Sequence, residues 1–263
     1  MYTNLAVEAK PNGVTVVTLN QPKTLNALGV EISRELGEAL ATAEADPATR
    51  VVVIRGAGRA FSSGGNLAHM REGIKDDPGQ YMDELTTAVY GAIKTLMGMN
   101  KPVIAQVHGF AYGAALNLVA ACDLAVAAED AVFCESFLKL GLIPGGYATL
   151  LLPAAIGMKR AVDLCLTARE VPAAEALAMG LISRVVPEKE LEARTLELAA
   201  ALAAAPPLAV QESKRLLRAA RERTGPEQAK VEREAQIRMA KTRDFKEGLD
   251  AFFEKRKPRF EGK

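Results

Sequence analysis

Several features that would point to particular protein classes are rare in this sequence or missing from it. Only three cysteines occur, Cys122, Cys134 and Cys165, and none forms a CxxC pair, so we expect free thiols rather than a disulfide framework. Two histidines and scattered carboxylates show no metal-ligand spacing, so we expect no metal site. No apolar run reaches the roughly 18 residues of a membrane span, and residues 1–10 lack the apolar stretch of a signal peptide. These absences predict a cytoplasmic protein without membrane contact.

An excess of charge of one sign is also missing. The chain has 33 Lys and Arg residues and 32 Asp and Glu residues, which gives a formal net charge of +1. This balance attracts neither nucleic acid nor an anionic membrane, so we expect no partner of either kind. Hydrophobic residues make up 49% of the 263 positions, enough for the core of one large domain.

Hydrophobic patterns predict an alternation of strands and helices over most of the chain. Runs rich in β-branched residues predict strands, and apolar residues at helical spacing predict amphipathic helices. The predicted strands are Val14–Asn20, Val51–Arg55, Val103–Val107 and Asp123–Ala128, and the predicted helices are Val30–Ala45, Gln80–Met99 and Ala114–Ala121. From Pro172 onward the pattern is almost wholly helical. We therefore predict an α/β core over residues 1–190 and a helical region over residues 191–263, without a separating linker.

Two glycine-rich turns, Ala60–Leu67 and Gly109–Asn117, each follow a predicted buried strand and precede a helix. Glycine and alanine let the backbone approach a ligand closely, and a helix N-terminus leaves N–H groups unpaired. Two such turns that converge could each offer one N–H group to an oxyanion. Close packing at strand–helix corners is the alternative explanation of the small residues. A dinucleotide fingerprint is disfavoured, because Phe61 stands where G-x-G-x-x-G requires its third glycine.

Four ordered segments resemble the enoyl-CoA hydratase/isomerase (crotonase) family over almost the whole chain. Pro22–Leu28 (PKTLNAL) resembles the family's P-x-x-x-N-A-L, and Gly58–Leu67 (GRAFSSGGNL) resembles G-x-x-F-x-x-G-x-D-L. Lys101–Leu124 resembles K-P-x-I-A-x-V-x-G followed by G-G-x-x-x-L and C-D, and Phe245–Arg256 resembles the C-terminal E-G-x-x-A-F-x-E-K-R. The resemblance implies a spiral of ββα turns whose C-terminal helices assemble a homotrimer, often a homohexamer built as a dimer of trimers. It also implies an acyl-CoA thioester substrate and no cofactor beyond the coenzyme A that this substrate carries.

The resemblance also assigns residues to the site. The two oxyanion N–H groups fall on Gly65 and on Ala114, where the family usually has glycine; alanine keeps the N–H. Asn66 replaces the family's usual aspartate, and we expect it to line the substrate groove and to cap the helix that begins there. Phe252 and Lys255 are expected to reach the coenzyme A nucleotide of a neighbouring subunit, although Lys255 also fits a solvated charge on a helix face. The other residues expected to bind the substrate are Lys23, Leu25, Ala27, Ser63, Gly64, Leu67, Ala68 and Gly113.

Family hydratases use two glutamates, and both positions are changed here. The first lies three residues after the second oxyanion residue and is Asn117; the second lies twenty residues further on and is Phe137. Neither side chain titrates, so the resemblance to a hydratase fails at the proton-transfer groups. Gly145 also stands where some dienoyl-CoA isomerases and dehalogenases place an aspartate.

Two other titratable residues are candidates for acid–base catalysis. Glu135 lies two residues before Phe137, on the segment that borders the acyl pocket, and burial in apolar surroundings would raise its pKa. Alternatively, Glu135 faces solvent or caps the short helix after it. His69 lies four residues after Gly65 and could carry protons, but the polar residues that follow it indicate a mobile surface segment. His108 is expected to be a hydrogen-bonded core histidine rather than a catalyst.

The sequence therefore predicts an acyl-CoA enzyme of the lyase or isomerase class that stabilises a thioester enolate in an oxyanion hole. Isomerisation, thioester hydrolysis, decarboxylation and retro-Claisen cleavage need fewer proton-transfer groups than hydration does, and all of them stay open. Slow, atypical hydration stays open as well. The alternative from another class is a protein that binds CoA thioesters without catalysis, which Asn117 and Phe137 favour. RNA binding, which lysine-rich helices mediate in some family members, is disfavoured because residues 80–100 contain only Lys94 as a cation.

Overall fold

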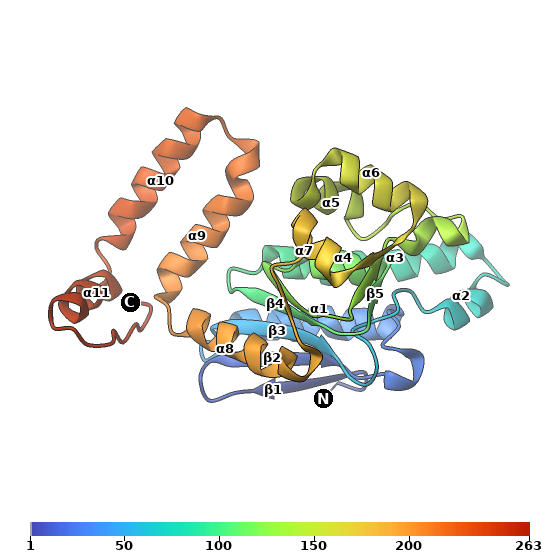
Figure 1. Ribbon diagram of the computed structural model, residues 1–263, viewed down its shortest axis with the longest axis horizontal. Coiled ribbons are helices and arrows are strands. Elements are labelled where there is room, and N and C mark those ends of the chain that lie inside the picture. The colour runs from blue at the N-terminus through green and yellow to red at the C-terminus, as the bar shows by residue number, and fades with distance from the viewer. Residues whose placement is uncertain (1) are drawn as a thin grey trace.

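The computed structural model describes residues 2–263, which form two sheets surrounded by helices (Figure 1). A six-stranded sheet has the order β1-β2-β3-β4-β6-β9, and a three-stranded sheet has the order β5-β7-β8. The strands are β1 (Leu5–Ala9), β2 (Val14–Leu19), β3 (Val51–Gly56), β4 (Val103–Val107), β5 (Phe110–Tyr112), β6 (Leu124–Ala128), β7 (Val132–Cys134), β8 (Glu170–Pro172) and β9 (Arg184–Val186). Two pairs, β1 with β2 and β7 with β8, are antiparallel, and the others are parallel.

Helices occupy most of the remaining chain. The α-helices are α1 (Val30–Ala45), α2 (Leu67–Gly73), α3 (Pro78–Gly98), α4 (Ala114–Ala121), α5 (Ala148–Ile156), α6 (Met158–Thr167), α7 (Ala173–Met179), α8 (Leu191–Ala203), α9 (Pro207–Ala219), α10 (Gly225–Met239) and α11 (Arg243–Phe253). Short 3-10 helices are η1 (Pro22–Thr24), η2 (Ser136–Leu140), η3 (Glu188–Glu190) and η4 (Ala220–Glu222).

The central strands of the large sheet are buried on both faces, as their continuous apolar sequences require. β3 and β4 read VVVIRG and VIAQV, and nearly every residue in them is buried. One face of the sheet packs against α1, α3 and α4, and the other packs against α8 (Figure 1). All four predicted strands are confirmed, and α1 and α4 have the predicted bounds.

The short strands form a second layer, which continues beyond β5, β7 and β8 as single bridges. Ala111 of β5 pairs with Phe133 of β7 and also forms a bridge with Ser62, while Leu28 forms a bridge with Gly65. Each of β2, β3, β4 and β6 is thus followed by a short extended segment in the second layer and then by a helix. This repetition confirms the predicted spiral of ββα turns.

The elements that the sequence does not predict are short or lie at edges. β1 buries only Leu5, so it lacks the alternation that marks a half-buried strand. β9 interrupts the stretch after Pro172 that was predicted as almost wholly helical, because it pairs with β6 and extends the large sheet. The polar segment after His69 is partly helical, since α2 continues to Gly73 and α3 begins at Pro78. α8, which the division at residue 190 places with the helical region, packs on the sheet.

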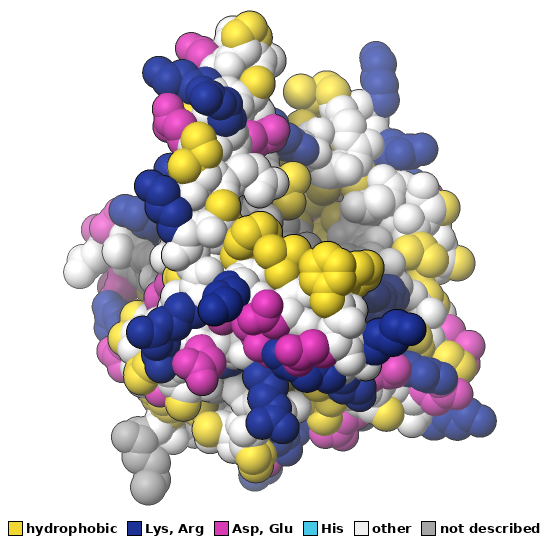
Figure 2. Space-filling model, turned by 90° about the vertical axis from the view of Figure 1, so that its left-hand side faces the viewer, with side chains coloured by type: hydrophobic (Ala, Val, Ile, Leu, Met, Phe, Trp, Pro, Cys, Tyr) yellow, Lys and Arg dark blue, Asp and Glu magenta, His cyan; other side chains and the backbone are white. Residues whose placement is uncertain are grey.

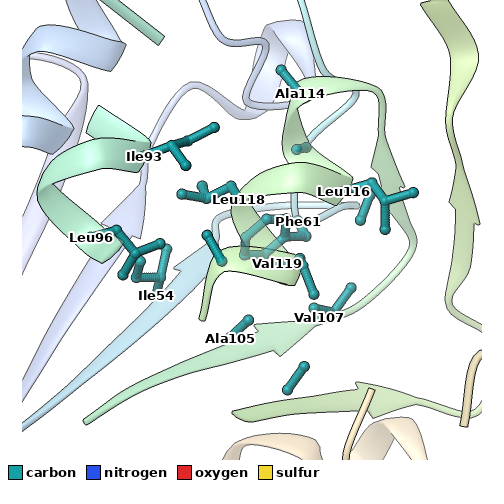
Figure 3. Packing of buried hydrophobic residues seen from close by; sticks show 14 of the residues in the cluster. Ile54, Phe61, Ile93, Leu96, Ala105, Val107, Ala114, Leu116, Leu118 and Val119 are labelled. Atoms are coloured by element: carbon teal, nitrogen blue, oxygen red, sulfur yellow. The ribbon is translucent and has the colours of Figure 1, made fainter. Parts of the chain in front are cut away.

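α4 lies in the core and fixes the position of its own N-terminus. Leu116, Leu118 and Val119 pack in one cluster with Phe61, which lies near the start of the first glycine-rich turn (Figure 3). Ala114, at the start of the helix, is also buried. The second glycine-rich turn is therefore held on rigid, close-packed residues.

Residues 206–263 leave the core as the C-terminal arm, which contains α9, α10 and α11 (Figure 1). The buried Lys214 holds the base of the arm, because its Nζ lies 2.7 Å from Asp123 Oδ2, beside β6. Arg218 Nη2 lies 2.8 Å from the other oxygen of the same carboxylate. Among the described residues no single helix is long and apolar enough to cross a membrane; α8 and α9, extended by η3 and η4, meet that test only as a pair bent by 105°.

Candidate functional site

The two glycine-rich turns lie directly against each other, as the sequence predicts. The Ser62 N–H donates to the Phe110 carbonyl at 2.9 Å, and the Tyr112 N–H donates to the Ser62 carbonyl at 3.2 Å. A Cβ atom on Gly64 would lie 2.4 Å from the Tyr112 carbonyl oxygen, and Gly64 has a φ of 87°. Only glycine fits there, because any other residue would both clash with backbone and adopt a left-handed conformation.

One N–H group from each turn is free of protein partners. Within residues 2–263, neither Gly65 nor Ala114 donates its backbone N–H to a protein acceptor. Ala114 is the first residue of α4, where helical N–H groups have no intrahelical acceptor. Gly65 directly follows Gly64, whose backbone contacts Tyr112, two residues before Ala114. The two turns thus bring their free donors to the same corner of the core; that both bind one oxyanion stays a prediction.

A third segment, Pro22–Leu28, fastens the first turn. The Leu28 N–H donates to the Gly64 carbonyl at 2.7 Å, and the Asn66 N–H donates to the Leu28 carbonyl at 3.2 Å. The buried Asn26 amide donates from Nδ2 to the carbonyls of Ala57, Ala60 and Phe61, at 2.8, 2.9 and 3.2 Å. Asn26 was not predicted to have a role of its own. The signal that could have revealed it is a polar residue between apolar neighbours in a turn, which indicates a side chain that replaces backbone hydrogen bonds.

Glu135 is completely buried, with an exposed fraction of 0%. Its Oε1 accepts a hydrogen bond from Asn117 Nδ2 at 3.1 Å, and the same amide group donates to the Gly145 carbonyl at 2.8 Å. Burial raises the pKa of Glu135 to about 8, and the bond from Asn117 opposes this rise only in part. Glu135 Oε2 and Asn117 Oδ1 are both buried and have no hydrogen-bond partner in the described residues. Asn117, which occupies the position of a family glutamate, therefore holds a different carboxylate beside α4.

The alternative position for Glu135, facing solvent or capping the next helix, is wrong. Glu135 stands immediately before η2, but its side chain makes no capping bond. The Glu135 side chain points instead toward Asn117 in the interior. Glu135 directly follows the last residue of β7, Cys134, and both residues are fully buried.

We expect stability to depend on pH through Glu135. The carboxyl has a pKa of about 8 in the folded chain and near 4.5 when unfolded, so the folded state keeps its proton over a range in which the unfolded state loses it. The free energy of unfolding should therefore fall as pH rises from about 4.5 to about 8, by on the order of a few kcal/mol. Glu135→Gln should remove this slope and unfold at higher denaturant concentration than the wild type at pH 8. Urea titrations at several pH values measure both; equal slopes in the two proteins would contradict the assignment.

Phe137, at the position of the second family glutamate, places its ring between two glycines. A Cβ on Gly113 would lie 3.6 Å from Cε2 of the ring, and a Cβ on Gly145 would lie 3.4 Å from Cε1. Tyr90 also approaches Gly145, with its hydroxyl oxygen 3.4 Å from the same Cβ position. The wall beside the turns is therefore aromatic where the family hydratases carry an acid.

The other titratable candidates have different partners. His69 is exposed, and its backbone N–H donates to Asn66 Oδ1 at 3.1 Å, so Asn66 caps α2 as predicted. The ring nitrogen Nδ1 of His69 lies 3.7 Å from the Cβ position on Gly29, at the start of α1. A ring nitrogen of His108, Nε2, lies 2.9 Å from the Gly58 carbonyl, as expected for a structural histidine. The Tyr112 hydroxyl donates to Glu170 Oε1 at 2.7 Å.

The residues predicted to bind the substrate fall into two places. Those near the turns surround Gly65, some buried (Ala27, Gly64, Gly113), some partly buried (Leu25, Ser63) and some exposed (Lys23, Leu67, Ala68). Phe252 and Lys255 belong to the C-terminal arm at the opposite end of the chain (Figure 1), and the Phe252 side chain is 77% exposed. Figure 2 views the arm side and shows hydrophobic side chains gathered among charged ones. Within one chain, Phe252 and Lys255 do not join the site, so their predicted role requires a neighbouring subunit.

Comparison with known proteins identifies the family to which this fold and sequence belong. The family model for enoyl-CoA hydratase/isomerase matches residues 9–263. A protein of Rhodobacter capsulatus named "Probable enoyl-CoA hydratase" is 36% identical over 254 residues, which cover 95% of each chain. The 1,2-epoxyphenylacetyl-CoA isomerase of Escherichia coli is 34% identical over 254 residues, which cover 95% of this chain and 96% of that protein. The crystal structure of an enoyl-CoA hydratase from Bacillus anthracis superposes with a TM-score of 0.93 at 32% identity, over 99% of this chain and all of the other. The chain therefore belongs to the enoyl-CoA hydratase/isomerase family.

Proposed function

We propose that this enzyme is an acyl-CoA isomerase, which moves a double bond along the acyl chain with Glu135 as its single base. The observation that carries the proposal is the buried carboxylate held by Asn117, three residues after Ala114 on α4. Residues three apart on a helix share one face, with Cβ atoms about 5–6 Å apart. The base therefore lies within reach of a thioester whose oxygen binds at the N-terminus of α4.

In this proposal, the thioester oxygen accepts hydrogen bonds from the N–H groups of Gly65 and Ala114. Removal of a proton from the α-carbon turns the thioester into an enolate, and the negative charge develops on this oxygen. Donors already in place stabilise that charge without reorganisation, and each is worth about 3–4 kcal/mol in comparable sites. The partial positive charge at the N-terminus of α4 acts in the same direction.

Glu135 Oε2 is the oxygen that takes the proton. Oε1 is engaged by Asn117, whereas Oε2 has no partner among residues 2–263. The ionised carboxylate accepts the α-proton of a β,γ-unsaturated thioester, the electron pair moves into the enolate, and the double bond shifts to the α,β position as the protonated Glu135 returns the proton to the γ-carbon. Protons and charge balance without a co-reactant or cofactor. A pKa near 8 suits a group that both takes and returns a proton near neutral pH.

Isomerisation fits this site better than hydration because it needs one titratable group instead of two. Hydration requires a group that activates water and another that delivers a proton to the α-carbon. Asn117 cannot titrate, and Phe137 has no proton to give.

We also propose that the enzyme works as a homotrimer or a dimer of trimers. α11 exposes Phe245, Leu249, Phe252 and Phe253, a larger apolar surface than a free helix face usually carries. Between α9, α10 and α11 lies a cavity of about 910 Å³ with largely apolar walls. A second copy packed against the arm would cover these surfaces and bring Phe252 and Lys255 to its own or a neighbouring coenzyme A.

A mass-spectrometric screen in deuterium oxide tests the reaction. Purified protein would be incubated with enoyl-, β-keto-, malonyl- and aryl-CoA thioesters. We expect a β,γ-enoyl thioester to become its α,β isomer with deuterium incorporated and no gain of water, at a rate that rises about tenfold per pH unit below about pH 8. A hydrated product would identify a hydratase, loss of CO₂ a decarboxylase, and free acid a thioesterase. Binding of thioesters without any turnover would identify an inactive CoA-thioester-binding protein.

A further inference from the structure

Three aromatic rings converge beside the proposed oxyanion donors. The distal edge of Phe137 lies 3.6 Å from the Cβ position on Gly113, which immediately precedes Ala114, and 3.4 Å from the Cβ position on Gly145, whose carbonyl accepts a hydrogen bond from Asn117. One ring edge therefore spans the distance between the proposed thioester position and the residues that hold Glu135. Any acyl group that leaves the thioester toward Glu135 passes this ring.

Tyr90 of α3 and Tyr147 extend the same aromatic wall. Their ring centroids lie 5.1 Å apart at an angle of 50°, and the Tyr90 hydroxyl oxygen lies 3.4 Å from the Cβ position on Gly145. Tyr147 has a φ of 64°, a left-handed conformation that is unfavourable for a bulky residue and persists only where the surroundings impose it. The three rings come from η2, α3 and the residue before α5, so three separate elements fix their arrangement.

Met70 of α2 lies beside Gly65, the first proposed oxyanion donor. Its methyl carbon Cε lies 2.6 Å from the Cβ position on Gly65. The thioether is polarisable and makes favourable contacts with aromatic rings. Met70, Tyr90, Phe137 and Tyr147 are all only partly buried, so each keeps apolar surface that a ligand can cover.

From this arrangement we infer that the acyl group of the substrate carries a flat, unsaturated ring. The inference rests on the acyl-CoA site proposed above. A linear chain gains only buried area from these side chains, whereas a flat ring also gains the edge-to-face or offset-stacked geometry that aromatic pairs prefer. The site therefore discriminates by shape and charge distribution of the acyl group, with Phe137 as the main determinant.

Calorimetric binding to Glu135→Gln protein tests the inference without depending on turnover. The probes are phenylacetyl-CoA and octanoyl-CoA, which have the same number of acyl carbons, and cyclohexylacetyl-CoA, a ring that is not flat. The octanoyl group is the most flexible and most apolar of the three. If affinity depended only on the apolar area that is buried, octanoyl-CoA would bind at least as tightly as the two ring thioesters. We expect phenylacetyl-CoA to bind about 10-fold more tightly than the other two. Equal or tighter binding of octanoyl-CoA would overturn the inference.

Phe137→Leu, made in the Glu135→Gln protein, removes the aromatic ring but keeps an apolar side chain. It therefore tests whether the affinity depends on aromaticity or on apolar bulk. We expect the affinity for phenylacetyl-CoA to fall about 3- to 10-fold while that for octanoyl-CoA stays unchanged. Phe110→Leu on β5 is the matched control and should change neither affinity. If all three thioesters bind with the expected preference and the screen above finds no turnover, the proposed isomerisation fails and the ring specificity stands. Should the Phe137→Leu variant not fold, the ratio of the three affinities in the Glu135→Gln protein still decides the question.

Discussion

Glu135→Gln is expected to lower the rate of double-bond migration and of α-proton exchange about 10³-fold. Glutamine has nearly the shape of glutamate, and its carbonyl oxygen can still accept the bond from Asn117 Nδ2. Only the ability to take a proton is lost, so the affinity for the thioester should change little. The measurement is deuterium incorporation and product formation with the best substrate of the screen, together with the dissociation constant of the substrate.

Glu170→Gln is the matched control for this prediction. Glu170 is an exposed carboxylate of β8 that accepts a hydrogen bond from the Tyr112 hydroxyl, close to the same turn. We expect the control to change the rate less than about threefold, because surface substitutions away from the reacting atoms have small effects. Activity that survives in Glu135→Gln would show that Glu135 is not the base and would leave catalysis to the oxyanion donors and solvent.

The strands of the large sheet could be predicted because runs of apolar residues indicate strands that are buried on both faces. Val51–Ile54 is a continuous apolar run, and Gln106 is the one polar residue of Val103–Val107, so both sequences fit a strand covered on both faces. The three-residue strands β5, β7, β8 and β9 contain too few residues to show a period. They exist because distant segments pair with them, and such non-local pairing leaves no mark in a short window.

The site, like the sheet, could be predicted where local sequence determines it and not where distant residues pair. Glycine at positions 64 and 113 is demanded by backbone conformation and close approach, and such demands can be read from a turn motif. The pairing of Asn117 with Glu135 could not be predicted from the sequence, because the two positions lie eighteen residues apart. They meet where the Gly113 N–H, just before α4, donates to the Cys134 carbonyl at the end of β7. Asn117 looked like a lost acid in the sequence; in the structure its amide is fixed by two acceptors and positions another acid.

Ala114→Pro is expected to lower kcat about 10²- to 10³-fold and to leave KM nearly unchanged. Proline removes the one N–H that the proposed oxyanion hole takes from α4. The substitution is mild for the fold, because proline is well tolerated at the first position of a helix. Gly113, the preceding residue, has φ 50° and ψ −121°, the mirror image of the extended backbone that residues before proline prefer, and glycine adopts both forms equally.

Ala114→Gly is the control, because glycine keeps the N–H and the family usually has glycine there; its kcat should stay within about threefold of the wild type. Thermal unfolding of both variants checks that α4 stays folded, and we expect the midpoint of Ala114→Pro to shift by no more than that of Ala114→Gly. A folded proline variant with wild-type kcat would mean that charge on the thioester oxygen is stabilised elsewhere. A loss of kcat confined to the proline variant ties catalysis to one backbone donor, since the two variants differ at this position chiefly in that hydrogen and the ring that replaces it. Combined with the Glu135→Gln result, it would separate stabilisation of the enolate from transfer of the proton, the two steps that the proposed isomerisation requires of this chain.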